Sequence, residues 1–294
     1  MNTYNPDTPV RRAEDISQPL VTVVTVVLND VKHLEQTILS VLNQTYKNIE
    51  YIIIDGGSTD GTVDIIKKYQ DRLAFWVSEK DKGIFYATNK GAEKATGEWI
   101  NYLNSGDYFF NNQVFETIFS KTHPTADLLY GSFIGNFNNQ AVECVAPPSV
   151  SDRSWKGMPV CHTAVFARTA LMKKFKFNTD YRVSADGEFM VRSAAAGCVF
   201  ERLDLIVFRV GTLGFSSTNW LKGRLENWKF CRHYFPGAKT DLFHAQGLAR
   251  EVVFRSFKYV TSLVGLYQLA RFIYRKKIQK KLPLLPKNVL PFQD

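Results

Sequence analysis

Acidic side chains follow two of the apolar runs in this sequence. Asp55 ends the run at residues 49–54, and Asp107 comes shortly after the run at residues 99–103. If both runs are strands of a parallel sheet, their carboxyl ends meet at one edge, where ligands bind in open α/β sheets. Carboxylates at such an edge can hold a divalent cation or accept a proton. The spacing therefore predicts that Asp55 and Asp107 face one crevice.

The elements that would position these residues alternate between strands and helices. Residues 20–28 form a nearly continuous β-branched apolar run, which is typical of a strand buried on both faces. Further strands are predicted at 49–54, 73–77 and 99–103, with helices at 31–42, 63–69 and 84–95 between them. Asp30 is the expected N-cap of the first helix. Alternation with short connections predicts a doubly wound α/β sheet.

The second half of the chain has a different pattern. A hairpin is predicted from 128–137 and 141–146, and further strands at 163–167 and 199–209. A helix at 189–196 is expected to begin near Asp186. Beyond residue 217 the sequence is helical in pattern and rich in Lys, Arg and aromatic residues.

Composition and charge limit the possible functions. The chain has 294 residues, 45% of them hydrophobic and 22% charged, which argues against a disordered protein and against a protein with many membrane spans. The net charge is +9, but residues 222–294 hold 15 Lys and Arg against 4 Asp and Glu, a net of +11, so the remaining residues carry 9 − 11 = −2. The basic character belongs to the C-terminal quarter. No recognised motif supports nucleic-acid binding, and we expect no nucleic-acid partner.

The cysteines and the N-terminus point to a cytoplasmic protein. Cys144, Cys161, Cys198 and Cys231 lack the spacing of a zinc site, so we expect reduced thiols. Residues 1–18 are polar, and no secretory signal is predicted. The longest uncharged stretch of the basic tail, residues 259–270, is shorter than the roughly 20 apolar residues of a spanning helix.

Six segments, in order, resemble family 2 glycosyltransferases of the bacterial exopolysaccharide and lipopolysaccharide type. They are TVVTVVLND (22–30), IIIDGGSTDGT (52–62), EKDKGIFYATNKGAEKATGEW (79–99), YLNSGD (102–107), CHTAVFAR (161–168) and SADGEFMVR (184–192). The resemblance implies a GT-A fold, which is a Rossmann-like α/β fold with a mixed sheet. It also implies a nucleotide-diphospho-sugar donor, with a UDP-sugar expected, Mn²⁺ or Mg²⁺ as cofactor, and transfer of a hexose with inversion.

The resemblance assigns roles to the residues at the first crevice. Asp107 is the expected metal ligand, beside Asn104 and Ser105, although Gly106 stands where many relatives carry a second acid. An alternative role for Asp107 is to cap the following turn. The nucleotide would be bound by side chains of the first two strand ends, namely Val27, Asn29, Asp55 and Asp60. Asp60 can also cap the helix that follows it.

A third block adds donor-binding candidates. Asp81, Lys82 and Asn89 match family positions, but Phe85 and Tyr86 replace the usual Tyr-Asp pair, which leaves the donor sugar open. Lys82 or Lys90 could bind phosphate. A solvated lysine on a helix face is the equally weighted alternative.

Asp186 is the catalytic base that the resemblance implies, since the acceptor hydroxyl must lose a proton. Ala185 stands where relatives have another acid, and an N-cap role for Asp186 is the alternative. Glu188 is a weaker candidate for the base. His162 matches a position near the acceptor, although a lone histidine among apolar residues is more often a core residue.

These inferences divide the chain into a polar tail (1–18), a GT-A domain (19–216) and a basic, aromatic-rich helical extension (217–294). The nucleotide-sugar half of the domain covers about 19–125, and the acceptor half about 126–216. A basic amphipathic extension suits the anionic inner face of the cell membrane, where a lipid-linked saccharide acceptor would lie. Packing on the catalytic domain or oligomerisation is the alternative for this extension.

The sequence therefore predicts a glycosyltransferase of surface polysaccharide biosynthesis. Because acids are missing at Gly106 and Ala185, an inactive nucleotide-binding homologue that scaffolds an assembly complex stays open. A nucleotidyltransferase is a second alternative, although the usual glycine-rich basic signature is missing near Leu28.

Overall fold

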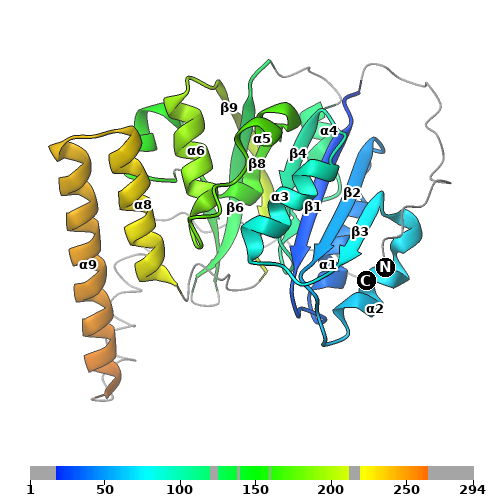
Figure 1. Ribbon diagram of the computed structural model, residues 1–294, viewed down its shortest axis with the longest axis horizontal. Coiled ribbons are helices and arrows are strands. Elements are labelled where there is room, and N and C mark those ends of the chain that lie inside the picture. Colours follow the sequence, from blue (N-terminus) through cyan, green and yellow to red (C-terminus); the bar gives the residue numbers. More distant parts are fainter. Residues whose placement is uncertain (1–17, 120–124, 138–139, 159, 212–218, 264–294) are drawn as a thin grey trace.

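The computed structural model describes residues 18–119, 125–137, 140–158, 160–211 and 219–263. The described strands form one nine-stranded sheet in the order β3-β2-β1-β4-β8-β6-β9-β5, with β7 paired to β6 (Figure 1). The strands are β1 Val21–Val27, β2 Ile49–Asp55, β3 Phe75–Ser78, β4 Trp99–Tyr102, β5 Tyr108–Phe109, β6 Leu128–Phe137, β7 Gln140–Cys144, β8 Val165–Arg168 and β9 Phe200–Arg209.

Helices connect and cover these strands. The α-helices are α1 Leu34–Leu42, α2 Thr62–Lys68, α3 Ile84–Lys94, α4 Val114–Phe119, α5 Thr169–Phe175, α6 Ala185–Ala195, α8 Trp220–Tyr234 and α9 Ala238–Leu263. Short 3₁₀ helices are η1 Gln70–Arg72, η2 Ser151–Lys156 and η3 His162–Ala164. The expected N-cap role of Asp30 is wrong, because His33 is the N-cap of α1 and the Asp30 side chain is used elsewhere.

The parallel half of the sheet is the part that the apolar runs predict. β1 pairs in parallel with β2 on one side and β4 on the other, and β3 extends β2. All seven residues of β1 are buried, since helices cover both faces of this half. The register places Val27 opposite Asp55, so the loops that follow β1, β2 and β4 open at one edge. The prediction of a common crevice rests on this geometry.

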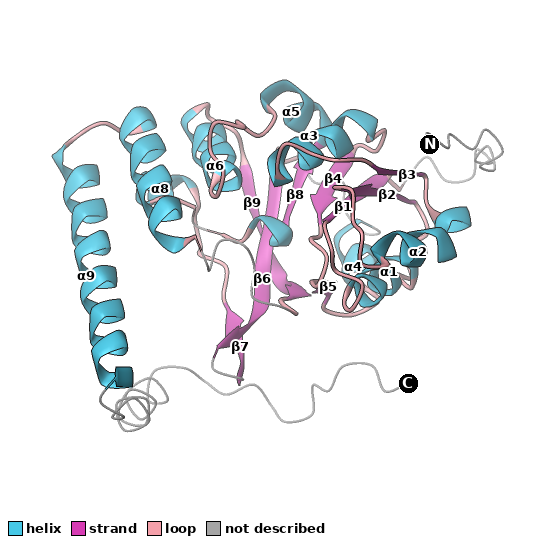
Figure 2. Ribbon diagram, turned by 60° about the horizontal axis from the view of Figure 1, so that its bottom comes forward, coloured by secondary structure: helices cyan, strands magenta, loops and turns pink. Residues whose placement is uncertain are grey.

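The sheet separates two hydrophobic cores. Alternate residues of β1 serve the two faces: Val24 and Val26 belong to one core, and Val21 and Val23 to the other. Helices α3, α5 and α6 cover the first face, and α1, α2 and α4 cover the second (Figure 2). Both layers are needed to bury the fully apolar strands of the centre.

The second half makes the sheet mixed. β8 runs antiparallel to both β4 and β6, and β9 runs parallel to β6. The structure also contains β5, a two-residue strand that pairs with the end of β9 and that no sequence pattern predicts. Because β8 lies directly beside β4, the segment that precedes β8 comes close to the loop that carries Asp107.

The C-terminal helices continue the body of the protein. Phe230 and Cys231 of α8 are fully buried in the core that also contains Phe189 and Met190 of α6. Helix α9 lies outside α8 at the edge of the molecule (Figure 1). Among the described helices, none combines the length and the apolar character needed to cross a bilayer.

A close contact between α3 and β1 yields a test of the packing. A Cβ atom at Gly91 would come within 2.3 Å of Val24 Cγ1, and the branched valine side chain has little freedom to move. We expect Gly91→Ala to lower the free energy of unfolding by about 1–3 kcal/mol, measured by urea denaturation.

Gly247→Ala in α9 is the matched control, because its Cβ would meet only Arg224 Nη1 at 3.8 Å. In an open helical position this change should raise the free energy of unfolding by up to about 1 kcal/mol. Equal effects of the two substitutions would contradict the packing argument.

Candidate active site

The loop after β2 is organised around a buried carboxylate. Asp55 is fully buried, and its oxygens accept hydrogen bonds from the backbone N–H groups of Gly57 (3.0 Å) and Ser58 (2.9 Å). They also accept the hydroxyls of Ser58 (2.5 Å) and Ser78 (2.6 Å). Asp55 thus holds the loop in shape, and direct contact with a nucleotide stays a prediction.

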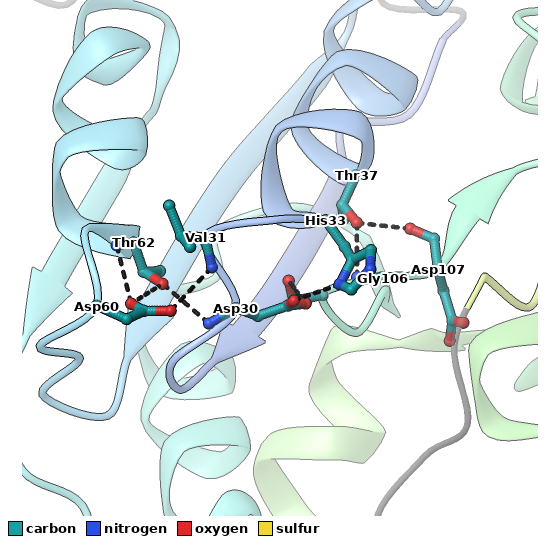
Figure 3. Close-up of polar contacts among 9 residues, drawn as sticks. Asp30, Val31, His33, Thr37, Asp60, Thr62, Gly106 and Asp107 are labelled. Carbon is teal, nitrogen blue, oxygen red and sulfur yellow. Dashed lines mark hydrogen bonds and ion pairs between the residues drawn. The ribbon is translucent and has the colours of Figure 1, made fainter.

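The loops after β1 and β2 are tied together. Asn29, with a positive φ of 52°, donates its N–H to Ser58 Oγ (2.7 Å) and accepts the Thr59 N–H on Oδ1 (2.9 Å). Asp60 accepts the hydroxyl (2.5 Å) and N–H (3.0 Å) of Thr62 and the N–H of Val31 (3.1 Å) (Figure 3). The Thr62 hydroxyl is the main reason that the pKa of Asp60 is lowered. Together these bonds build one wall of the crevice.

Asp60 therefore binds the N-terminal end of α2, as the sequence analysis allowed, although it is not the N-cap residue. The N-cap residue of α2 is Gly61, while Asp60 binds the first helical N–H from one position earlier. Val27 is buried at the end of β1 and presents its carbonyl to the Gly56 N–H.

Helix α1 supports the loop that carries Asp107. The Thr37 hydroxyl donates to the Asp107 carbonyl (2.8 Å) and accepts the Gly106 N–H (3.0 Å), as Figure 3 shows. The Asp107 carboxylate accepts the Gly211 N–H at 3.3 Å. Burial raises the pKa of this carboxyl to about 7, against smaller lowering effects of that N–H and of His162. A bound cation would favour the charged form.

Asp30 is a site residue that the sequence analysis missed. Its carboxylate accepts the Ser105 hydroxyl (2.7 Å) and pairs with His33 Nδ1 (2.5 Å), so it joins the loops after β1 and β4. Figure 3 shows Asp30 and His33 close to the Gly106–Asp107 loop. A usable signal existed, since Asp30 follows a strand end just as Asp55 and Asp107 do.

Three predicted site residues form one hydrogen-bonded chain. Asn104, after β4, lies 3.1 Å from His162 Nε2, and His162 Nδ1 lies 2.8 Å from Asp186 Oδ2. Burial alone lowers the pKa of His162, but the hydrogen bond and charge of Asp186 and the charge of Asp107 outweigh it and raise that pKa. His162 is thus a polar bridge from the Asp107 loop to the start of α6, with both ring nitrogens paired, and its role near the acceptor stays a prediction.

Asp186 does not cap α6. Ser184 is the N-cap, and Asp186 is the second residue of the helix. Its second oxygen, Oδ1, accepts the N–H of Gly187 at 2.8 Å. The side chain keeps 12% of its surface exposed, and it lines a cavity on the side of α8 and α9.

The donor-binding candidates of segment 79–99 have different surroundings in the structure. Lys90 forms ion pairs with Asp81 (2.8 Å) and Glu79 (2.7 Å), so its charge is already neutralised within the protein. Lys82 is exposed. Asp81 Oδ2 is buried and has no hydrogen-bond partner among the described residues, so it can accept a ligand donor. The Asn89 amide is paired with the backbone N–H (2.8 Å) and C=O (2.9 Å) of Phe177, so it connects α3 to the segment before α6.

Glu188 does not join the other candidates. Its side chain is only 2% exposed, it accepts the Tyr234 hydroxyl (2.7 Å), and it pairs with Arg192 (3.2 Å). The Tyr234 hydroxyl fastens α6 to α8, whereas the pair with Arg192 lies within α6. A role at the acceptor therefore finds no support in the contacts of Glu188.

A second buried glutamate positions the start of α6. Glu226 of α8 accepts the consecutive backbone N–H groups of Arg182 (3.0 Å), Val183 (2.9 Å) and Ser184 (2.9 Å). Ser184 directly precedes α6 and therefore sets the direction in which Asp186 points. The sequence gives no local signal for this contact, because the partners are more than 40 residues apart.

Comparison with known proteins decides the family. The sequence model described as glycosyl transferase family 2 matches residues 22–143. An uncharacterized glycosyltransferase of Mycobacterium tuberculosis is 32% identical over 184 residues, covering 60% of this chain and 70% of the relative. The chain belongs to glycosyl transferase family 2. A PGL/p-HBAD biosynthesis glycosyltransferase of the same organism is 29% identical over 187 residues, with the same coverage.

Solved structures identify the fold of this family 2 glycosyltransferase. Residues 1–349 of Staphylococcus aureus TarS in complex with UDP align with a TM-score of 0.57 at 19% identity, covering 81% of this chain and 74% of that one. The mannosyltransferase PcManGT of Pyrobaculum calidifontis, in complex with GDP-Man and Mn²⁺, aligns with a TM-score of 0.57 at 16% identity, covering 87% and 83%. The fold is GT-A, as the sequence predicts.

The Glu226 contact gives a prediction for the glycosyltransferase fold. Glu226→Ala leaves three backbone donors without their acceptor, and we expect the free energy of unfolding to fall by about 2–4 kcal/mol. Urea denaturation measures the loss. Glu201→Ala, at an exposed position of β9, is the control and should change stability by less than about 0.5 kcal/mol. Equal losses in the two variants would show that the Glu226 contact does not contribute to the free energy of unfolding.

Proposed function

We propose that this protein is an inverting glycosyltransferase that moves a hexose from a UDP-sugar to a hydroxyl of a lipid-linked saccharide in surface polysaccharide biosynthesis. The observation that carries the proposal is the chain from Asn104 through His162 to Asp186. It joins the crevice at the strand ends to a carboxylate that borders a separate cavity. Two-substrate transfer needs such an arrangement, with a donor on one side and an acceptor on the other.

The proposed donor site is the crevice after β1, β2 and β4. Val27, Asn29, Asp55 and Asp60 would enclose the nucleoside, and Asp81, Lys82 and Asn89 would lie toward the sugar and phosphates. The unpartnered oxygen of Asp81 supports this assignment. We favour UDP as the nucleotide because residues 1–349 of TarS, which share the fold, have been solved in complex with UDP and with UDP-GlcNAc.

The proposed cofactor is Mn²⁺ or Mg²⁺, held by Asp107. The described residues contain no group of three or more His, Cys, Asp or Glu side chains arranged for a metal. They nevertheless fit a cation shared with the donor, since Mg²⁺ is commonly bound by one or two carboxylates, substrate phosphates and water. When bound, the cation would neutralise charge on the departing diphosphate. With Gly106 in place of a second acid, Asp107 would be the side-chain carboxylate that holds the cation.

In the proposed mechanism, Asp186 takes the proton of the acceptor hydroxyl while its oxygen attacks the anomeric carbon. The bond between that carbon and the phosphate breaks, and the configuration inverts. His162 holds Asp186 through Nδ1, and Asn104 holds the opposite ring nitrogen, so the carboxylate keeps one direction. Asn104 and Ser105 fix the loop beside Asp107.

Asp186→Asn tests the proposed base. The substitution keeps the shape but removes basicity, and we expect kcat to fall by roughly 10²–10⁴-fold while the KM for the donor stays within a factor of two. Asp180→Asn, an exposed aspartate just before α6, is the matched control and should retain full activity. Near-normal turnover by the Asp186 variant would remove it as the base.

Asp107→Asn tests whether the protein is an active enzyme or an inactive scaffold. We expect the wild type to release UDP from a panel of UDP-sugars with Mn²⁺, and the variant to lose this activity. Thermal shifts with each nucleotide-sugar, with and without Mn²⁺, report donor binding independently, since a ligand of the native state raises stability. A wild type that is stabilised by donors but releases no UDP would favour the inactive homologue.

The proposed location is the inner face of the cell membrane. Helix α9 exposes Leu242, Val252, Val253, Tyr259 and Val260 with 45–68% of their surface accessible. Residues 264–294 add seven Lys and Arg against one Asp, a net of +6. Apolar side chains with basic neighbours bind anionic lipid surfaces.

Removing residues 264–294 tests this location. At about 1 kcal/mol for each basic residue near an anionic surface, we expect binding to phosphatidylglycerol-rich vesicles to weaken at least ~10-fold. Vesicle sedimentation measures it, with phosphatidylcholine vesicles as control. Undiminished binding of the shortened chain would contradict the proposal.

A further inference from the structure

A cavity of about 380 Å³ lies between the start of α6 and the helices α8 and α9. Its volume falls within the range of small-ligand sites. Its lining includes Asp186 and Gly187 of α6, Trp220, Arg224 and Asn227 of α8, and His244 of α9. All of these residues lie outside the segment matched by the family model, residues 22–143.

Part of the cavity lining is polar. Asn227 Nδ2 donates to Ser184 Oγ (3.2 Å) and to the Gly223 carbonyl (2.8 Å), so both side chains are held beside Asp186. His244 is 7% exposed, and burial is the main reason that its pKa is lowered. Hydroxyls and amides fixed in this way suit the hydroxyl groups of a saccharide.

Two cations, Lys156 and Arg224, line the cavity, and the carboxylate of Glu251 lies among them. Lys156 lies over the rings of Trp155 (5.0 Å) and Phe243 (5.7 Å), and within the described residues no carboxylate pairs with it. Arg224 lies 3.8 Å from Glu251, which is long for an ion pair. Glu251 is itself held by Arg255 at 2.8 Å, so Arg224 and Lys156 both remain able to bind an anion.

Asp186 belongs both to this cavity and to the chain that leads to the crevice. Its Oδ2 contacts His162 and through it Asn104, and the same residue lines the cavity. None of the lining residues is one of the proposed donor-site residues, so a ligand in the cavity could reach this carboxylate while a donor occupies the crevice. Trp220, which stacks with Arg255 at 4.3 Å, adds an aromatic face to the lining.

We propose that this cavity is the acceptor subsite, and that it takes a saccharide joined to a phosphate. The saccharide hydroxyl reaches Asp186, and Lys156 and Arg224 bind the phosphate by charge-assisted hydrogen bonds. The inference rests on the proposed glycosyl transfer and adds the chemical class of the acceptor and the residues that select it. Phosphate on a lipid carrier and phosphate on a free saccharide satisfy the same chemistry.

The test compares three probes by calorimetry on the full-length protein, with and without saturating UDP. The first is a short-chain prenyl pyrophosphoryl N-acetylglucosamine, the second is octyl N-acetylglucosaminide, which lacks phosphate, and the third is N-acetylglucosamine 1-phosphate, which lacks the lipid. We expect the two phosphorylated probes to bind at least ~10-fold more tightly than the octyl glycoside. Preference between these two identifies the source of the phosphate.

The variant pair Lys156→Gln with Arg224→Gln should weaken the phosphorylated probes at least ~10-fold and leave the Kd for UDP unchanged. Lys239→Gln is the matched control, because Lys239 lies 4.4 Å over the same Trp155 ring but does not line the cavity. It should change probe binding by less than a factor of two.

Three results would overturn the inference: unchanged probe binding by the double variant, no advantage of the phosphorylated probes, or no binding of any probe to the wild type. Loss of the proposed function has a different signature, since the protein would then neither bind nor hydrolyse UDP-sugars. A wild type that releases UDP but ignores the probes overturns only the acceptor subsite.

Discussion

The contact between His162 and Asp186, 2.8 Å long, is the interaction on which the site depends. Together with Asn104, it links the strand-end crevice to α6 through the imidazole ring. Asn104, His162 and Asp186 belong to three segments: Asn104 follows β4, His162 precedes β8, and Asp186 lies in the first turn of α6. The mixed sheet makes the contact possible, because antiparallel β8 lies beside β4 and brings His162 to the end of that strand.

The rest of the fold holds this contact in place. On the donor side, Asp55, Asp60 and Asn29 fasten two loops to each other, and Thr37 fixes the backbone around Asp107. On the acceptor side, Glu226 and Glu188 tie α8 to the start and to the body of α6. The helical C-terminal part therefore supports the start of α6 and lines the cavity that we propose as the acceptor subsite.

Much of the parallel half could be predicted from the sequence, because fully buried strands read as β-branched runs and their ends carry polar residues. Asn104, His162 and Asp186 were predicted singly from a resemblance, and their hydrogen-bonded relation was not. That relation depends on the pairing of β4 with β8, which no periodicity encodes. Strand β5 was missed because two residues give no pattern, and Glu226 because its partners are distant in sequence. Asp30 was interpreted as a helix cap, since its local position fits that role and its contact with Ser105 is long-range.

The three backbone groups bound by Glu226 have a consequence for the order in which the protein matures during synthesis. The N-terminal part of a chain emerges first during synthesis, and a domain generally folds as a unit. The parallel strands β1 to β4 emerge early, but β4 then lacks its neighbour β8 and the Asp107 carboxylate lacks the Gly211 N–H. The backbone N–H groups before α6 gain their hydrogen-bond acceptor, Glu226, only once α8 has emerged. Helix α9 must follow to complete the lining of the cavity. The proposed site is thus complete only after the greater part of the polypeptide has left the ribosome.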